Sequence, residues 1–279
     1  MPKVVTTPEW HALLSAHHLH TVAGVYDLKE AAQIIKRGES SAVLRVQLRG
    51  TQAHTLIIKK YWVTKPSQLW SGFWRGTFMG RPKVRREFEN LARLRAWGMD
   101  APSPVAYGEE RRCRWLTRSF LISECVAEPL PLDLFIRDHL PSLPPEERRR
   151  TRRELIDHLA DYTRRLHTHH FVHHDYFWRN IILSGGSLSR FFLIDAHKGG
   201  QWPSWAEQAS RAKDLATLDA PAPHFFRRTE RLRFFLRYVG HASLTDEDKK
   251  LIHCALKIAA PLRERQYRRV QRAQRFNEN

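Results

Sequence analysis

This chain of 279 residues has few of the features that define secreted, zinc-ribbon or membrane-spanning proteins. Its three cysteines, Cys113, Cys125 and Cys254, are odd in number, far apart and without Cys-x-x-Cys spacing. That pattern indicates a reducing compartment and argues against a disulfide framework. No stretch approaches the ~18 uncharged apolar residues of a membrane span. The first nine residues contain no apolar signal core, so we expect a cytoplasmic protein.

Acidic residues are also scarce, because 29 Asp and Glu stand against 47 Lys and Arg and leave a formal net charge of +18. An excess of charge of one sign gives information about binding partners and not about the fold. This positive charge is compatible with three kinds of anionic partner: nucleic acid, an anionic membrane face, or a phosphorylated or acidic glycan. The hydrophobic fraction of 42% is typical of a globular protein and excludes disorder and collagen-like structure. No repeat of solenoid or propeller length is visible.

The first half of the chain has the pattern of a small antiparallel sheet with one helix. Short β-branched runs bounded by glycine and polar residues predict strands, and apolar residues at helical spacing before Gly98 predict a helix. The expected elements are a helical or irregular lead-in over 1–24, strands over 25–62, an aromatic-rich loop over 64–82, a helix from about Pro82, and strands near Trp115 and over 119–122.

The second half is mainly helical. A proline-rich connector with one short helix spans 128–145, and Pro144-Pro145-Glu146-Glu147 has the pattern of a helix start. A compact β unit is expected over 171–195, and helices over 205–279 with a break at Pro261. We therefore expect an α+β fold of two lobes, a small antiparallel-β N-terminal lobe over 1–124 and a larger helical lobe over 125–279.

The strongest chemical signal is the segment from His173 to Asn180, followed by Leu193-Ile194-Asp195. Its form, His-x-Asp-x4-Asn and then two apolar residues and Asp, resembles the catalytic loop and metal-binding Asp of the protein-kinase-like superfamily. Phosphoryl transfer needs a carboxylate near the attacking hydroxyl and oxygen ligands for Mg²⁺ on the phosphates. We expect Asp175 to orient or deprotonate the hydroxyl, and Asn180 and Asp195 to bind Mg²⁺.

A lysine inside the third expected strand completes this pattern. Lys59 resembles the kinase lysine that holds the α- and β-phosphates of ATP, and a charge in a strand is costly unless it is paired. Lys60 is the alternative, and alternation along a strand sends the two to opposite faces. Glu87, early in the following helix, is the expected partner of Lys59, with Glu89 as the second choice.

The rest of the nucleotide site follows from position alone. Ser40 and Ser41, in a loop with a single glycine, are expected to contact the phosphates of ATP. The connector Ser123-Glu124-Cys125-Val126 is expected to contact the adenine through its backbone. The bulky Tyr176, Phe177 and Trp178 beside the catalytic loop suit either a sugar acceptor or core packing, and both readings stay open.

Several further segments resemble one branch of this superfamily, the lipopolysaccharide kinases that phosphorylate heptose or Kdo of the inner core, with the related InaA-like proteins. These segments are Trp74-Arg75-Gly76-Thr77, Arg85 to Leu94, Ala101 to Pro104, Asp195-Ala196-His197-Lys198, Lys213-Asp214-Leu215 and Arg231 to Leu236. The resemblance covers roughly residues 25–240. It implies ATP, Mg²⁺ and transfer to a sugar hydroxyl of the lipopolysaccharide inner core, catalysed by a phosphotransferase.

Two other classes of function stay open. A RIO-like or other protein kinase acting on a ribonucleoprotein would also suit the positive charge, and a non-catalytic pseudokinase that binds an anionic partner would suit the single-glycine loop. No Ala-Pro-Glu element follows Asp195, which favours a glycan acceptor over a protein.

The arginine-rich tail after Arg263 suits peripheral contact with an anionic inner membrane. The histidines between His167 and His174 are a weaker candidate for a metal site, and nucleic acid is the least favoured partner.

Overall fold

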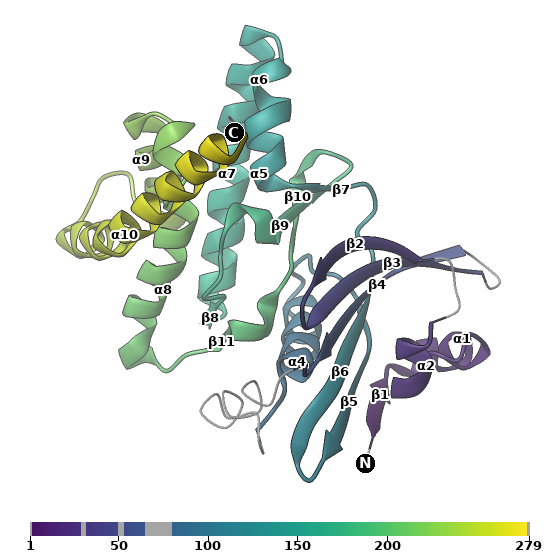
Figure 1. The fold of residues 1–279 in the computed structure, drawn as a ribbon. Coiled ribbons are helices and arrows are strands. Elements are labelled where there is room, and N and C mark those ends of the chain that lie inside the picture. The colour runs from purple at the N-terminus through teal and green to yellow at the C-terminus, as the bar shows by residue number, and fades with distance from the viewer. Residues whose placement is uncertain (1, 29–31, 50–52, 65–79, 278–279) are drawn as a thin grey trace. The chain divides into compact units, whose positions relative to one another are not determined.

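The computed structural model describes residues 2–28, 32–49, 53–64 and 80–277, with the side chains of 204–205 and 265–277 left out. The chain forms two compact units. Unit 1 consists of Met1–Ala127 and Ile194–Lys198, and unit 2 of Glu128–Leu193 and Gly199–Asn279 (Figure 1). The short segment 194–198 therefore belongs to unit 1, although the residues on both sides of it belong to unit 2. No helix in the described ranges is both long and apolar enough to cross a bilayer.

Unit 1 contains an antiparallel sheet, built in the described residues from strands in the order β1-β5-β6-β4-β3-β2. The strands are β1 (Lys3–Thr6), β2 (Ala32–Gly38), β3 (Ser41–Arg49), β4 (Ala53–Trp62), β5 (Pro104–Arg112) and β6 (Trp115–Glu124). The antiparallel sheet confirms the expectation for this half of the chain. The register pairs Lys59 with Val43 on one side and with Leu121 on the other.

The N-terminal lead-in differs from its prediction. Residues Lys3–Thr6 form an edge strand on β5, and the strand-like reading from Val25 is wrong because Val22–Tyr26 is a helix, α2. The side chain of Thr21 accepts a hydrogen bond from Gly24 N at 3.0 Å and caps this helix, while Val22 and Val25 are buried. A β-branched pair spaced by three residues suits the buried side of one helical turn as well as a strand.

The two faces of this sheet carry different partners. On one face, α1 (His11–Ala16) and α2 cover a core that includes Leu14, Leu56, Ile58 and Phe120. The other face, which carries Lys59, packs against the predicted helix, α4 (Lys83–Ala96), where Phe88 meets Tyr107 at 5.1 Å between ring centroids. Gly98 follows α4 with φ +68°, a conformation that favours glycine. The expected aromatic loop falls mostly on residues 65–79, outside the described residues.

Unit 2 is mainly helical, as expected. Helices α7 (Pro145–Thr168), α8 (Ser204–Asp219), α9 (Arg228–Val239) and α10 (Asp246–Asn277) share a core that contains Ala160, Leu215, Phe235 and Ala259. Small β elements complete it: β7 (Pro129–Pro131), β9 (Ile181–Ser184) and β10 (Ser187–Leu193) in one sheet, and β8 (Phe171–Val172) with β11 (Gly200–Gln201) in another.

Two predictions about prolines are wrong in unit 2. The proline-rich connector is helical over most of its length, as α5 (Leu132–Leu134), a π-helical turn (Phe135–His139) and α6 (Leu140–Ser142). Helix α10 also continues through Pro261. A proline removes one helical hydrogen bond, and the burial of Ala255 and Ala259 in the helical core offsets that loss.

Replacement of Gly108 is expected to destabilise unit 1. A Cβ at Gly108 would lie 2.3 Å from Cε1 of the buried Phe120, so Gly108→Ala forces this ring to move. We expect a loss of about 1–3 kcal/mol in the free energy of unfolding, measured by urea denaturation. Gly200→Ala is the control, because a Cβ there meets nothing within 4 Å. Equal stability of the two variants would contradict this packing argument.

Candidate functional site

One lysine joins three elements of unit 1. Lys59 Nζ, on β4, donates a hydrogen bond to Glu87 Oε1 on α4 at 2.7 Å. The same Nζ also forms an ion pair with Asp195 Oδ1, in the segment that returns to unit 1. The structure thus brings together three of the residues predicted to form the site, which lie far apart in the sequence.

The lysine and its glutamate are almost completely shielded from water. The side chain of Lys59 is 11% exposed and that of Glu87 is 3% exposed, whereas the side chain of Asp195 is 38% exposed. Burial by itself lowers the pKa of Lys59, but the carboxylates of Glu87 and Asp195 outweigh it and raise that pKa above its usual range. Lys59 is therefore a permanent cation with one partner in the protein interior and one at the edge of solvent.

The neighbouring candidates have other contacts. Lys60 lies on the opposite face of the sheet, 5.6 Å from the centroid of the Tyr26 ring. Glu89 accepts a hydrogen bond from Arg85 Nε at 2.8 Å, so its carboxylate is used on the surface of α4. The alternation of strand residues and the helical spacing of Glu87 and Glu89 separate each pair physically.

The segment that carries Asp195 has an uncommon backbone. Asp195 has φ +57°, a left-handed conformation that aspartate tolerates at some cost and that clusters at functional sites. Asn90 Nδ2, on α4, donates to Ala196 O at 2.7 Å and holds the next residue. Asn90 is buried, and sequence reasoning did not identify it, because an asparagine inside a helix gives no indication of a partner that lies 106 positions away.

His197 follows in the same segment and is held neutral. Burial and, to a smaller extent, the charges of Lys83, Lys198 and Lys59 together lower its pKa to about 4 against the opposing effect of Asp195. At neutral pH the imidazole therefore adds no positive charge beside Asp195.

The predicted catalytic loop lies in unit 2. Asn180 Nδ2 donates to Asp175 O at 2.8 Å and to Asp175 Oδ2 at 3.1 Å, so the asparagine holds both the backbone and the carboxylate of Asp175. Arg179 lies 3.8 Å from Asp175 Oδ2 and adds a positive charge beside it. Because the amide nitrogen of Asn180 is used in this way, Oδ1 is the atom of its side chain that suits a metal ion.

A buried aspartate anchors this loop, and sequence reasoning gave it no role. Asp214, on α8, is 0% exposed and accepts hydrogen bonds from His173 N at 2.7 Å and His174 N at 2.8 Å. His174 has φ +62°, so the carboxylate holds a strained turn directly before Asp175. The same helix also carries Glu207 and Asp219, so the sequence gives no signal that distinguishes Asp214 as the buried anchor.

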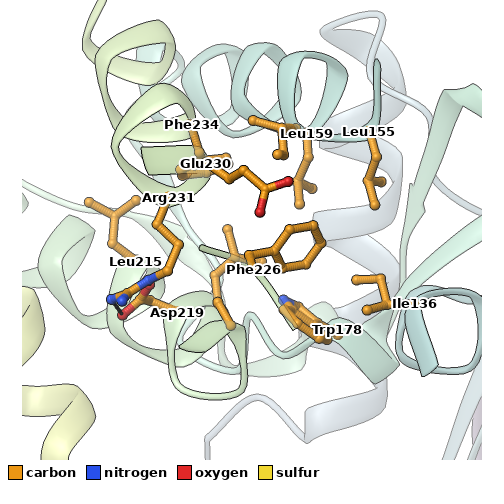
Figure 2. Close-up of a pocket in the computed structure, with 13 residues that line it drawn as sticks. Ile136, Leu155, Leu159, Trp178, Leu215, Asp219, Phe226, Glu230, Arg231 and Phe234 are labelled. Atoms are coloured by element: carbon orange, nitrogen blue, oxygen red, sulfur yellow. Dashed lines mark hydrogen bonds and ion pairs between the residues drawn. The ribbon is translucent and has the colours of Figure 1, made fainter. Parts of the chain in front are cut away.

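Two aromatic residues of the loop pack in the core of unit 2. Tyr176 is fully buried, and its hydroxyl lies 3.0 Å from Thr163 Oγ1. Trp178 packs against Phe225 and Phe226 and lines a small apolar pocket of about 70 Å³ together with Ile136 and residues of α7, α8 and α9 (Figure 2). For Tyr176 and Trp178, core packing is therefore the reading that the structure supports over contact with a sugar.

The remaining nucleotide candidates lie along the sheet of unit 1. Ser41 pairs with Tyr61 on the face that also carries Lys59, and Ser40 lies in the β2–β3 turn. At the end of β6, Glu124 N donates to Ser103 O at 2.9 Å and Cys125 N donates to Thr55 O at 2.9 Å. Two of the expected adenine donors are thus already used within the protein. Ser123 is buried in the sheet.

The candidate residues therefore fall into two groups, each with its own geometry. Lys59, Glu87 and Asp195 meet in unit 1, and Asp175 and Asn180 meet in unit 2. Among the described residues, no group of three or more His, Cys, Asp or Glu side chains is arranged to hold a metal ion. The histidines near the catalytic loop have structural partners instead, such as Tyr238 for His167 and Glu207 for His170.

Comparison with known proteins identifies the fold of this chain. A solved structure described as WaaP in complex with acyl carrier protein matches with a TM-score of 0.61 over 96% of this chain and 98% of that one, at 20% identity. This likeness shows a shared kinase-like fold. The lipopolysaccharide core heptose(I) kinase WaaP of Pseudomonas aeruginosa is 28% identical over 161 residues, which are 56% of this chain and 59% of that protein.

The family model described as lipopolysaccharide kinase (Kdo/WaaP) matches residues 27–238. The chain therefore belongs to the lipopolysaccharide kinase family, as the resemblance of its sequence motifs predicted. The match includes Lys59, Glu87, Asp175, Asn180 and Asp195, the residues that form the two groups described above.

Loss of the buried lysine charge is expected to remove phosphotransfer. Lys59→Met keeps the alkyl chain but removes the cation, and turnover should fall by about 100-fold or more because preorganised charge is lost. ADP release in the steady state measures this. Lys257→Met, on an exposed part of α10, removes one charge elsewhere and is the matched control. Unchanged turnover in Lys59→Met would contradict the role of this cluster.

The neutral His197 predicts a specific sensitivity to acid. Its folded pKa of about 4 lies below its unfolded value of 6.5, so the unfolded chain binds a proton first as pH falls. The stability that the neutral imidazole contributes above the unfolded pKa of 6.5 is therefore lost progressively as the pH falls toward the folded pKa of about 4. His197→Asn should lose less stability than wild type between about pH 7 and about pH 5 in urea denaturation. An identical loss in both proteins would overturn the assignment.

Proposed function

We propose that this protein transfers the γ-phosphoryl group of ATP to a hydroxyl of a heptose or Kdo residue in the lipopolysaccharide inner core. The observation that carries the proposal is the buried Lys59 held between Glu87 and Asp195. It stands within a chain whose family match spans residues 27–238. The aligned part covers 59% of the heptose kinase WaaP, so the acceptor is proposed from family membership and from site chemistry together.

Lys59 has the chemistry needed to bind the phosphates of ATP. Its charge is fixed by two carboxylates, and a cation held in place before the substrate arrives needs little reorganisation during the reaction. Glu87 is the buried partner that positions it, and the more exposed Asp195 is the carboxylate that faces incoming ligands. Ser40 in the β2–β3 turn and Ser41 at the start of β3 are proposed to add hydroxyl and backbone N–H groups to the phosphates.

The adenine is proposed to bind at the end of β6, with Val126 as the donor among the four residues of the expected connector. Because the N–H groups of Glu124 and Cys125 already donate to protein carbonyls, the backbone N–H of Val126 is the proposed donor to the ring. Ser123, Glu124 and Cys125 then contribute contact surface and carbonyl acceptors. The Cys125 thiol donates to Val126 O at 3.3 Å and supports this turn.

Asp175 is proposed to orient the acceptor hydroxyl and to accept its proton at a carboxylate oxygen. Asn180 and Asp214 set the position of Asp175, the first through its side-chain amide and the second through the backbone of the preceding residues. Proximity and orientation of this kind account for a large part of the rate in phosphoryl transfer.

Mg²⁺ is the proposed metal, and the donor atoms fit it. Asn180 Oδ1 and the carboxylate of Asp195 are hard oxygen ligands of the kind that Mg²⁺ prefers. When bound, the ion would neutralise charge on the β- and γ-phosphates. Asp195 is paired with Lys59 through Oδ1, and its carboxylate is the proposed acidic ligand of the ion.

The two other classes of function are less well supported. A protein kinase acting on a ribonucleoprotein would not account for a match to the lipopolysaccharide kinase family over most of the chain. A pseudokinase would have no need to keep a lysine buried between two carboxylates, since burial of charge is costly. The surplus of positive charge suits a phosphorylated and carboxylated acceptor, and peripheral contact with an anionic inner membrane is proposed on the same ground.

The acceptor is tested by mass spectrometry of core oligosaccharide. Cells that lack the gene should lose one phosphate from the inner core, and the wild-type gene should restore it. Asp175→Ala should fail to restore it, because loss of a general base typically costs about 10²–10⁴ in rate. Tandem mass spectrometry then identifies the phosphorylated sugar.

Three controls separate the alternatives. Lys257→Met should restore the phosphate like wild type, and near-native circular dichroism of Asp175→Ala shows that its fold is intact. Phosphate transfer to protein but never to core oligosaccharide would establish a protein kinase instead. Restoration of the phosphate by Asp175→Ala would contradict the proposed mechanism.

A further inference from the structure

The outer face of the unit 1 sheet is the face opposite Lys59. Along β4, the side chains on this face change from apolar to polar. Where α1 and α2 cover it, this face is apolar, with Leu56 and Ile58 of β4 in the core. Two residues further along the same strand and on the same face, the side chains become Lys60 and then Trp62. There the face borders an open pocket, which Tyr26 at the end of α2 also lines.

The register assembles this pocket from five strands, β2 to β6. Arg37, Ala42 and Lys60 are paired across β2, β3 and β4, so they form one row on the outer face. Ala42 is the small central residue, and it leaves space between two cationic side chains. In the next row, Trp62 is paired with Arg118, which is paired with Glu110.

One aromatic ring fixes the two innermost cations. Lys60 Nζ lies 5.6 Å and Arg118 Cζ 5.1 Å from the centroid of the Tyr26 ring. The hydroxyl of Tyr26 donates to Tyr61 O at 2.6 Å and contacts Ser119 O at 3.2 Å, which ties the ring to β4 and β6. The ring therefore cannot swing away, and the two cations stay near each other.

The charges in this pocket are unbalanced. Its cationic lining residues are Arg37, Lys60, Arg112 and Arg118, and its one carboxylate in the described residues is Glu110, 4.0 Å from Arg118. Lys60 is only 7% exposed, and no carboxylate of the described residues lies within ion-pair distance of its Nζ. Asp27 is close enough to favour the charged form, but burial outweighs it and lowers the pKa of Lys60.

A buried cation without a carboxylate destabilises a folded protein, and a methionine of similar length would avoid that cost. Positions that break a local rule of this kind are expected at functional sites. The neighbouring Lys59 shows the contrast, because its buried charge is matched by Glu87 and Asp195. At Lys60 no carboxylate of the described residues forms an ion pair, and Asp27 acts on it only from a greater distance. A ligand anion would supply the missing ion-pair partner.

From this juxtaposition of Lys60, Arg118 and Arg37 around Ala42, we infer that the outer face of unit 1 binds a phosphate group of a ligand distinct from the ATP bound at Lys59. The group comes either from an anionic lipid headgroup or from a small soluble phosphate ester. Aliphatic and aromatic side chains at the same pocket, Ile34, Leu44 and Trp62, suit the non-phosphate part of such a ligand. The inference is independent of the proposed kinase activity.

The test measures binding of two probes to the full chain. In one arm, co-sedimentation with phosphatidylcholine vesicles is compared with and without phosphatidylglycerol. In the other arm, glycerol 3-phosphate is titrated by calorimetry. Binding in the first arm alone identifies a lipid headgroup as the source, and binding in the second identifies a free phosphate ester. In either case binding should weaken at high salt.

Variants separate this site from the nucleotide site. Lys60→Met and Arg118→Gln should each weaken probe binding by about ten-fold or more, since charge-assisted contacts to phosphate are lost. Lys257→Met, which removes a charge from α10, should bind like wild type. Lys59→Met should lose turnover but keep probe binding, so failure of the proposed activity and failure of this inference are distinguishable.

Thermal unfolding gives a second readout. Lys60→Met should raise the melting temperature without ligand, because it removes an unpaired buried charge, and it should abolish the further rise that the probe produces in wild type. Lys257→Met should show neither change. Absence of binding in both arms, or equal binding by wild type and Lys60→Met, would overturn the inference. A lower melting temperature of Lys60→Met would overturn its premise that this charge is retained at a cost.

Discussion

The structure of unit 1 depends on one buried cation. Lys59 lies on a strand, Glu87 on a helix and Asp195 on a segment that returns from unit 2, and one ammonium group contacts both carboxylates. Such a cluster is costly to desolvate, and it is strongly destabilising to leave any member unpaired. The helix, the sheet and the returning segment are therefore held in one arrangement. That arrangement also leaves Asp195 the most exposed of the three, where a ligand can reach it.

Two consecutive lysines on β4 take part in different sites, because successive side chains of a strand point to opposite faces of the sheet. Lys59 and Lys60 differ by one position, yet the first lies against α4 and the second against Tyr26 on the other face. Both are largely buried, and only Lys59 has carboxylate partners among the described residues. The same physical rule, that a buried charge requires an opposite charge, explains the stability of one site and points to a ligand at the other.

The catalytic loop in unit 2 is held in a comparable way, by an anion instead of a cation. Asp214 accepts hydrogen bonds from two successive backbone N–H groups, those of His173 and His174, and the second of these residues has a positive φ. A turn of this kind persists only where surrounding contacts determine it. His167, whose Nδ1 lies 2.8 Å from the hydroxyl of Tyr238, packs beside Asp214 and links the loop to the helical core.

Local pattern was enough to predict the antiparallel sheet, helix α4 and the helical second half, because side-chain periodicity and turn residues act over a few positions. The resemblance of the chain's ordered motifs to those of protein-kinase-like enzymes suggested Lys59, Glu87 and Asp195 as a group. Local pattern did not predict that Lys3–Thr6 adds an edge strand or that α10 continues through Pro261, because distant strands and packed alanines decide both outcomes. The choice between Lys59 and Lys60 likewise depended on which face of the sheet meets α4, which is a property of the tertiary structure. Asp214 and the unmatched charge of Lys60 became recognisable only in three dimensions, because burial and the absence of a partner are relations between segments far apart in the chain.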